Sequence, residues 1–201
     1  TADRQQVIYS VSKYDIQNNI SHHTLYAIPV SGGEAKKIND TTGSGFQLLP
    51  DNRIGYTYKG QWWEMNTDGS QVKQVTHSKN AMDNIRISPN GRYILFTREV
   101  KVGNMTGTDF YPQFSKSDVK IYTSLNYRHW DTWEDGQYSH VMYATLDSSG
   151  NIGVPVDIMS YEPYDCPQKP YGGIEDLQWS PDGKYIVYVC KKKKGKDYAL
   201  S

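Results

Sequence analysis

Three features are scarce in this chain of 201 residues: cysteine, net charge and long apolar runs. Its 22 basic and 22 acidic side chains cancel, so the net charge provides no electrostatic footprint for DNA or RNA and we expect no nucleic-acid partner. No apolar run approaches the roughly 18 residues of a membrane helix, and no signal sequence is visible, so we expect no membrane partner. The sequence leaves open whether its two cysteines, Cys166 and Cys190, form a disulfide, and we expect two unpaired thiols.

Motifs for catalysis and for metal binding are also missing. A serine nucleophile on a Gly-x-Ser-x-Gly elbow is absent, and Ser148-Ser149-Gly150 has the composition of a hairpin turn instead. None of the five histidines belongs to a His-Glu-x-x-His pattern, so we expect no metal site and no cofactor. The chain by itself is therefore predicted to be catalytically inert.

What the sequence does contain is a repeated turn-and-strand cassette. Ser-Pro-Asn-Gly-Arg-Tyr-Ile-Leu-Phe at residues 88–96 returns as Ser-Pro-Asp-Gly-Lys-Tyr-Ile-Val-Tyr at residues 180–188. Proline presets φ near about −65°, Asn or Asp binds its own backbone, and glycine accepts the positive φ of a tight turn. The apolar run that follows is then predicted to form a strand.

The cassette recurs at a regular interval, with one exception. Two weaker copies align on the turn residue, which gives the anchors Asp3, Asp51, Asn90 and Asp182. The first three anchors are spaced by roughly the 40–45 residues typical of a four-stranded propeller blade. The interval from Asn90 to Asp182 is about twice as long as this period. The third repeat therefore carries an insertion, at residues 99–140.

We predict an all-β fold: an incomplete β-propeller of three to four antiparallel four-stranded blades, in a single domain. The predicted blade units cover residues 1–40, 46–77, 85–160 and 174–201. An ordinary antiparallel sandwich is the alternative, but a sandwich does not require nearly identical cassettes at a fixed period. A closed ring needs roughly 250–350 residues at this period, so we expect the chain to be a piece of a longer protein.

Strands are predicted from the apolar runs between turn signals. They cover residues 7–14, 24–30, 36–38, 46–49, 53–58, 61–66, 71–76, 85–87, 93–100, 141–146, 154–158, 177–179 and 185–190. The runs at 93–96 and 186–189 are apolar on both faces, as expected of blades with a neighbour on each side. Open strand edges at Val7 and Tyr185 predict association into a homo-oligomer.

The insertion carries the most unusual mixture of residues. Its distal end reads Tyr-Arg-His-Trp-Asp-Thr-Trp-Glu-Asp-Gly at residues 127–136. Aromatic rings with a few charges suit a surface that binds a peptide and fixes its orientation, and Arg128, Trp130 and Asp131 are candidates for that role. The alternative is a loop packed by its own Trp and Tyr rings, with Arg128 paired to Asp131 or Glu134.

The run from Arg128-His129-Trp130-Asp131 to Gly136 resembles the propeller of dipeptidyl-peptidases and acylaminoacyl-peptidases in the prolyl oligopeptidase family of serine peptidases. Residues 7–12, 172–183 and 198–201 are similar to this branch too, so the resemblance spans essentially the whole chain. It implies a propeller that gates access to a C-terminal α/β-hydrolase domain missing from this chain and helps recognise the N-termini of peptide substrates. It also implies a periplasmic or secreted location.

The resemblance nominates acid pairs as substrate-binding residues. In dipeptidyl-peptidase relatives, two acidic residues from a propeller extension hold the substrate's ammonium group, which measures the distance from the free N-terminus to the scissile bond. Glu134 with Asp135, and Glu175 with Asp176, are the candidates here, although neither is the Glu-Glu pair associated with that role. The alternative for both is an exposed acid pair that caps a turn or pairs with a nearby Lys or Arg.

The alternative function is a non-enzymatic propeller scaffold for protein–protein interaction, like the periplasmic TolB proteins, whose blades share the Ser-Pro-Asp-Gly turn. The Arg-His-Trp-Asp run argues against it. Two further segments have structural interpretations: the lysine run at 191–196 predicts a solvated hairpin tip, and the Pro-rich segment 161–171 predicts an extended crossover between blades.

Overall fold

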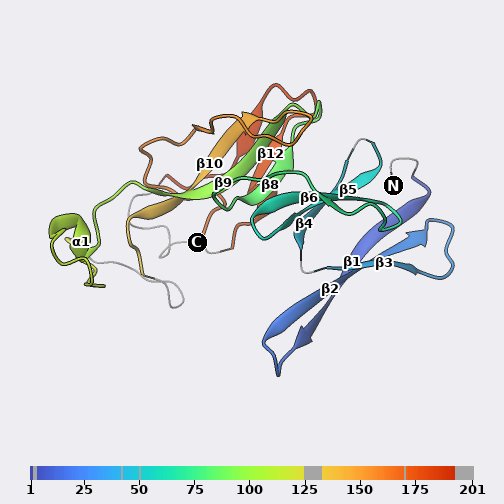
Figure 1. Cartoon of the computed structure of the whole chain (residues 1–201), viewed down its shortest axis with the longest axis horizontal. Helices are drawn as coiled ribbons and strands as arrows, with labels where there is room; N and C mark the ends of the chain where they lie inside the picture. The colour runs from blue at the N-terminus through green and yellow to red at the C-terminus, as the bar shows by residue number, and fades with distance from the viewer. Residues whose placement is uncertain (2–3, 42, 50, 125–132, 170, 193–201) are drawn as a thin grey trace. The chain divides into compact units, whose positions relative to one another are not determined.

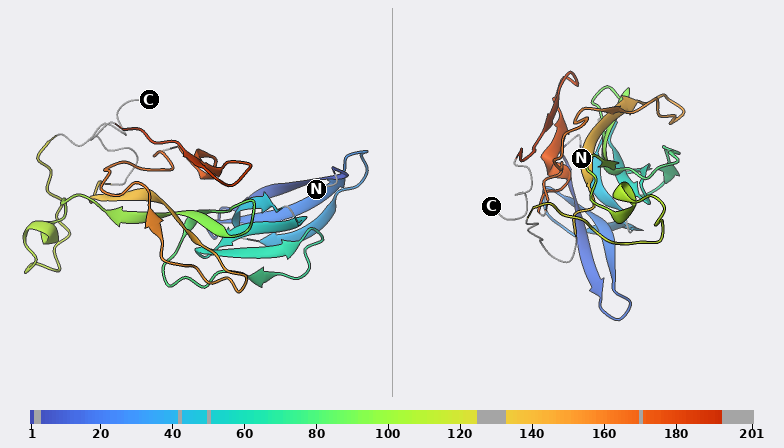
Figure 2. Two further views of the ribbon diagram at one scale, coloured as in Figure 1. Left: turned by 90° about the horizontal axis from the view of Figure 1, so that it is seen from above. Right: turned by 90° about the vertical axis from the view of Figure 1, so that its left-hand side faces the viewer.

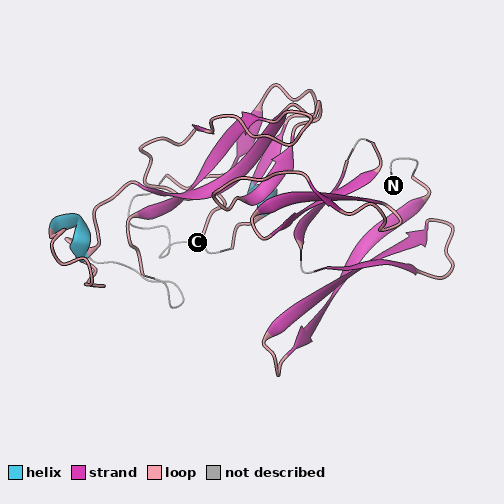
Figure 3. Ribbon diagram, viewed as in Figure 1, coloured by secondary structure: helices cyan, strands magenta, loops and turns pink. Residues whose placement is uncertain are grey.

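The computed structural model describes residues 1, 4–41, 43–49, 51–124, 133–169 and 171–192, and most of their regular structure is β-strand (Figures 1 and 3). Within these residues, four sheets follow one another along the chain, and each strand pairs with its neighbour in sequence. The first sheet contains β1 (Gln6–Asp15), β2 (Ile20–Pro29) and β3 (Lys36–Thr41), and the second contains β4 (Ser44–Leu48), β5 (Arg53–Tyr58), β6 (Gln61–Asn66) and β7 (Lys73–Gln74). The third sheet contains β8 (Asp83–Ile87), β9 (Tyr93–Lys101), β10 (Gln137–Thr145) and β11 (Val156–Asp157). The fourth contains β12 (Leu177–Trp179) and β13 (Ile186–Tyr188).

This succession of up-and-down sheets confirms the predicted fold class, an all-β incomplete propeller. The predicted strands at 53–58, 61–66 and 177–179 have the bounds of β5, β6 and β12. The strands predicted at 71–76 and 154–158 are shorter, as β7 and β11, whereas the strand predicted at 36–38 is longer, as β3. β10 begins earlier than predicted, at Gln137, because it pairs with the whole length of β9.

The strands are distributed over two compact units. Unit 1 comprises Thr1–Ile85 together with Asp147–Ile152. Unit 2 comprises Arg86–Leu146 together with the described residues from Gly153 onward. The insertion between β9 and β10 therefore belongs to unit 2.

The two copies of the turn cassette are built from the same hydrogen bonds. In the first, Ser88 Oγ donates to Asn90 Oδ1 at 2.8 Å, and the same oxygen accepts from the Arg92 N–H at 3.0 Å. Gly91 and Gly183 have φ of 71° and 69°, a region that glycine adopts without a steric penalty. The second copy repeats both side-chain bonds, at 2.6 and 3.1 Å, with Ser180, Asp182 and Lys184. The predicted turn chemistry is confirmed.

The two sheets of unit 1 lie next to each other (Figure 2), and side chains from both form its core. Leu25 of β2 packs in one cluster with Ile54 and Tyr56 of β5 and Met65 of β6, and none of the four is more than 4% exposed. The facing sides of two neighbouring blades are thereby removed from water, which is how stacked repeats gain most of their stability.

The core of unit 2 is formed by β9, β10, β12 and the segment between β11 and β12. Its fully buried members are Leu95, Val141, Met159, Cys166 and Leu177. Ile94 and Phe96 are also fully buried, so β9 is covered on both faces, as predicted. β13 differs from that prediction, because Val187 is 63% exposed and only one side of the strand packs on the core.

The Pro-rich segment 161–171, apart from residue 170, which lies outside the described residues, is the connection between β11 and β12, as predicted. The Ser139 N–H of β10 donates to Asp165 Oδ1 at 2.8 Å, and the Cys166 N–H donates to the Ser139 carbonyl at 2.8 Å. Of the lysine run, Lys191 and Lys192 lie within the described residues, and Lys192 Nζ pairs with Glu162 Oε1 at 2.7 Å.

Candidate functional site

The insertion begins where the pairing of β9 with β10 ends. Because Lys101 lies opposite Gln137, the two strands extend into the predicted range 99–140, and the insertion proper covers residues 102–136. The carbonyl of Gly136 accepts hydrogen bonds from Val102 N–H at 2.9 Å and Gly103 N–H at 3.1 Å, which closes its base. Beyond this base lies a single turn of helix, α1 (Gly107–Phe110) (Figure 1).

Asp109 of α1 organises the first half of the insertion. Its Oδ2 accepts hydrogen bonds from Lys101 Nζ at 2.7 Å, from Met105 N–H at 2.9 Å and from Thr106 N–H at 2.7 Å. The hydrogen bond from Lys101, followed by those from Thr106, holds the pKa of this carboxyl well below its usual range. An ionised carboxylate therefore ties the helical turn to the end of β9.

A hollow of about 610 Å³ opens on the insertion, and we call it the insertion pocket. It is lined by Asp118, Lys120, Tyr122, Trp133 and Asp135. The rings of Tyr122 and Trp133 stack, with centroids 6.0 Å apart and planes 30° apart. The Tyr122 hydroxyl donates to the Glu134 carbonyl at 2.7 Å, which fixes the ring, and Trp133 remains 48% exposed. The pocket thus offers an aromatic surface to a ligand.

Asp135 places a negative charge beside these rings. Its carboxylate accepts hydrogen bonds from the Gln137 N–H and from Gln137 Nε2, each at 2.9 Å. Burial raises the pKa of Asp135, but these hydrogen bonds and the charge of Lys101 outweigh it, so the pKa lies below its usual value. The carboxylate is therefore ionised at neutral pH and suited to bind a cation.

The other two charges at the pocket, Lys120 and Asp118, pair with each other, and the charge of Asp135 also acts on Lys120. Lys120 Nζ donates to Asp118 Oδ1 at 2.5 Å, and this hydrogen bond raises the pKa of Lys120. The Asp118 side chain is 95% exposed. Asp135 is thus the pocket carboxylate that the fold holds in place, whereas Asp118 projects into solvent.

The structure separates the two members of the predicted acid pair in the insertion. Asp135 lines the insertion pocket. The Glu134 backbone carbonyl accepts a hydrogen bond from Tyr122, and the charge of its side chain acts on Lys169. The predicted residues Arg128, Trp130 and Asp131 lie outside the described residues. Part of the alternative, a loop packed by its own rings, is seen in the described residues. Tyr122 stacks on Trp133, and the ring centroids of Tyr111 and Phe114 lie 6.3 Å apart.

The second predicted acid pair makes contacts within unit 2. Glu175 and Asp176 lie in the 3-10 turn η1 (Ile174–Asp176) directly before β12, and neither lines the insertion pocket. Asp176 Oδ2 accepts from the Gln168 N–H at 2.9 Å, which ties the Pro-rich segment to this turn. The charge of Glu175 acts on Arg86, whose guanidinium donates to the Ile174 carbonyl at 3.0 Å. These contacts match the alternative in which the acids stabilise a turn.

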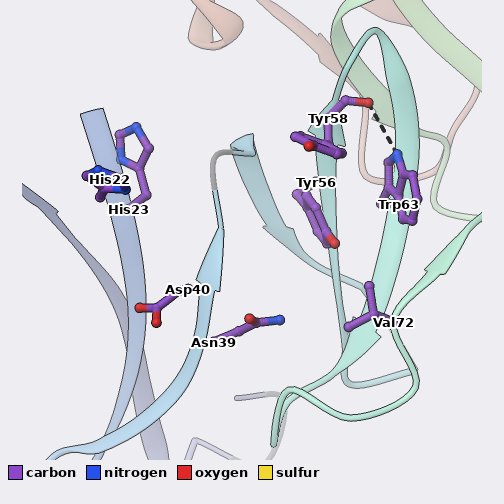
Figure 4. Close-up of a pocket in the computed structure, with 8 residues that line it drawn as sticks. All are labelled: His22, His23, Asn39, Asp40, Tyr56, Tyr58, Trp63 and Val72. Atoms are coloured by element: carbon purple, nitrogen blue, oxygen red, sulfur yellow. Dashed lines mark hydrogen bonds between the residues drawn. The ribbon is translucent and has the colours of Figure 1, made fainter. Parts of the chain in front are cut away.

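Unit 1 contains a second hollow, of about 630 Å³, that the sequence did not predict (Figure 4). Tyr56 and Tyr58 of β5 and Trp63 of β6 line one side, and the amide of Asn39 in β3 points toward them (Figure 4). The carboxylate of Asp40 points away (Figure 4) and pairs with Lys37 at 2.5 Å. The one available signal was the spacing of Tyr56 and Tyr58, because residues two apart lie on the same face of a strand.

The histidines within the described residues belong to no metal-binding group. No group of three or more potential ligands that could hold a metal ion occurs within this part of the chain. His140 is fully buried, with Nδ1 2.9 Å from Asp157 Oδ2 and Nε2 2.8 Å from the Glu162 carbonyl, so it links β10, β11 and the crossover. No described helix is long and apolar enough to cross a membrane.

Comparisons with known proteins agree with the resemblance. No family model matches the chain. Dipeptidyl-peptidase 5 of Porphyromonas gingivalis is 35% identical over 99% of this chain, and Dipeptidyl-peptidase 5 of Porphyromonas endodontalis is 29% identical over 98%. The chain spans 30% and 29% of the length of these two relatives.

Similar solved structures include Pyrococcus horikoshii acylaminoacyl peptidase, at 17% identity and a TM-score of 0.49. The matched region covers 76% of this chain and 23% of the peptidase chain. A putative TolB from Agrobacterium tumefaciens has 17% identity and a TM-score of 0.48, and covers 94% of this chain and 56% of that chain. The relatives match this chain from end to end at the level of sequence. Over its whole length the chain is therefore similar to one segment of the dipeptidyl-peptidases, which confirms the resemblance inferred from its sequence.

Proposed function

We propose that this chain is the part of a dipeptidyl-peptidase that receives the free N-terminal end of a peptide, and that the insertion pocket is the receiving site. The observation that carries the proposal is the ionised Asp135 beside the stacked rings of Tyr122 and Trp133. A carboxylate makes a charge-assisted hydrogen bond to an α-ammonium group, and aromatic rings offer an apolar surface to the first side chain of the peptide.

The chemistry of peptide cleavage is assigned to another part of the longer protein. The present chain contains no Gly-x-Ser-x-Gly elbow, so its contribution is binding and access rather than nucleophilic attack. The proposed full protein carries a C-terminal α/β-hydrolase domain and acts in the periplasm or outside the cell. The propeller would admit short peptides and hold the free end at a set distance from the scissile bond, which raises the effective concentration of the reacting groups.

Asp135 is the better candidate of the acid pair for contact with the substrate. Burial lowers the pKa of Lys169, but the charges of Asp165 and Glu99, with a smaller effect of Glu134, outweigh burial and raise it. The negative charge of Glu134 is therefore already directed at a cation of the protein. The charge of Asp135 also acts with cations, Lys101 and Lys120, but its carboxylate is held by Gln137 and lines the insertion pocket, whereas neither Glu134 nor Lys169 lines it.

Steady-state kinetics of the full-length protein test this proposal. The substrates are a chromogenic dipeptide with a free amino group and the same dipeptide with an acetylated amino group. We expect Asp135→Asn to lower kcat/KM for the free-amino substrate about 10- to 100-fold, the value of one charge-assisted hydrogen bond. The acetylated substrate carries no ammonium group, so its kcat/KM should change little.

Two carboxylates serve as matched controls. Asp118→Asn removes a charge from the same pocket, but from an exposed side chain that Lys120 already pairs with, so its effect should be several times smaller. Glu134→Gln removes the neighbouring charge outside the pocket. Equal losses of kcat/KM on the free and acetylated substrates in Asp135→Asn would remove Asp135 from the binding role, because they would indicate a general disturbance of the insertion.

A further inference from the structure

The two cysteines of the chain, far apart in sequence, belong to the same core of unit 2. Cys166 is fully buried in the cluster that contains Leu95, Val141 and Leu177. Cys190 follows β13 and packs against this cluster from its partly buried position. Both are thiols in the structure. A chain with two cysteines thus places both against one small group of apolar side chains.

A single backbone oxygen connects the two cysteine segments. The Asp176 carbonyl accepts from the Val189 N–H at 2.8 Å, and the same oxygen lies 3.8 Å from Cys166 Sγ. Val189 is the residue directly before Cys190. The pairing of Leu177 with Tyr188 holds this region in the antiparallel register of β12 and β13. The sulfur of Cys166 and the residue before Cys190 therefore meet at the same carbonyl oxygen.

The backbone of Cys166 is fixed from the opposite side, by β10. Its N–H donates to the Ser139 carbonyl at 2.8 Å, and its carbonyl accepts from Ser139 Oγ at 3.0 Å. With both backbone groups held by one residue, the main chain at Cys166 is fixed close to the strand pair of β12 and β13. A disulfide requires two cysteines that are held close in space.

The surroundings of Cys166 make it a poor target for oxidants once the protein is folded. Burial, together with the charge of Asp176, raises the pKa of the Cys166 thiol to about 12. The thiolate is the form that attacks a disulfide, and it is scarce at such a pKa. Reversible redox sensing is thereby disfavoured. A bond between these sulfurs would form while the chain folds and would then be shielded from reductants.

We propose that Cys166 and Cys190 are a disulfide-forming pair that ties the crossover before β12 to the end of β13. In the reaction, one cysteine thiolate attacks a small-molecule disulfide such as oxidised glutathione, and a mixed disulfide forms as one glutathione leaves. The second cysteine then displaces the other glutathione. The two cysteines lose two electrons and two protons, and one oxidised glutathione becomes two reduced molecules. The bond would restrain the unfolded chain between residues 166 and 190.

Peptide mapping of the full-length protein tests the pair. The protein is refolded with mixed oxidised and reduced glutathione, unfolded, treated with iodoacetamide and digested without reductant. We expect one linked peptide pair that contains residues 166 and 190, lighter than the two free peptides by two hydrogen atoms. Refolding with reduced glutathione alone should give both peptides alkylated. Alkylation of both cysteines after oxidative refolding would overturn the proposal.

Thermal unfolding supplies a second measurement that does not depend on the yield of peptides. Reduction of the oxidised protein under denaturing conditions, followed by refolding with reductant, should lower its Tm by roughly 5–10 °C. Cys190→Ser, at the partly buried position, should show no such dependence on reductant. A reductant-dependent shift of the same size in Cys190→Ser would assign the effect to other cysteines and reject this pair. Neither outcome bears on the insertion pocket, so the two proposals fail independently.

Discussion

The sheet of β4–β7 and the insertion between β9 and β10 are held together by different forces. In the sheet, Trp62 and Met65 of β6 are fully buried, and the cluster around Ile54 consists of apolar and aromatic side chains. In the insertion, Phe110 and Phe114 are 44% and 59% exposed, and the clearest contacts are hydrogen bonds to the carboxylates of Asp109 and Asp135. The blade is stabilised by burial, whereas the insertion is stabilised by ionised groups that leave its rings accessible.

The largest effect should come from removing a buried ring of the blade. We expect Trp62→Ala to lower the free energy of unfolding by about 3–5 kcal/mol, because a fully buried indole is lost and a cavity remains. Trp133→Ala, in the insertion, should cost less than about 1 kcal/mol, since that ring is 48% exposed. Urea denaturation followed by far-ultraviolet circular dichroism measures both changes without relying on tryptophan fluorescence.

Similar losses of unfolding free energy in the two variants would contradict the difference between a blade held by burial and an insertion held by charge. A large loss in Trp133→Ala alone would mean that the insertion contributes to the core. The Trp133 variant should still lower the affinity for peptides if the insertion pocket is the binding site.

The difference between the two regions also explains which features the sequence predicted. The Ser88 and Asn90 turn chemistry is local, because every hydrogen bond lies within a few residues, so its pattern could be read directly. The resemblance nominated Asp135 as half of an acid pair, but nothing in the sequence nominated Tyr122, because its stacking on Trp133 depends on how the loop folds back. The burial of Cys166 beside Cys190 likewise follows from the packing of separate strands.

An effect of intermediate size is expected from alanine at two glycines, one in a blade turn and one at the base of the insertion. Gly91 has open space where a Cβ would be, so Gly91→Ala should cost about 1 kcal/mol, from its positive φ alone. At Gly136, whose φ is also positive, a Cβ would lie 2.1 Å from the Gly103 carbonyl oxygen. Gly136→Ala should therefore cost more than Gly91→Ala and open the base of the insertion. Hydrogen exchange of the Val102 and Gly103 amides, which donate to Gly136, reports that opening.

Equal stability of the two alanine variants, with unchanged exchange at Val102 and Gly103, would contradict the close approach of the two backbones. The comparison is matched because both glycines have a similar φ, of 71° at Gly91 and 83° at Gly136. Any additional loss at Gly136 is thus a steric effect.

The smallest expected effect is local and depends on pH. The pKa of Asp109 is lowered, first by Lys101 and then by Thr106, so its stabilising contribution is complete above the ordinary aspartate pKa of about 4. That contribution is lost as the pH falls through the lowered value in the folded protein. We expect the amides of Met105 and Thr106, which donate to Asp109, to lose protection from hydrogen exchange in acid.

The blade turns contain an internal control for this pH dependence. The Arg92 N–H donates to Asn90, which does not titrate, whereas the Lys184 N–H makes the same bond to Asp182, whose pKa is lowered by Ser180 and Lys184. After correction for intrinsic exchange rates, protection of the Lys184 amide should fall in acid while that of Arg92 persists. Asp109→Asn should abolish the pH dependence at Met105 and Thr106 without altering it at Lys184. Parallel loss of protection at all four amides would indicate global acid unfolding and would remove the distinction between an insertion held by charge and a blade held by burial.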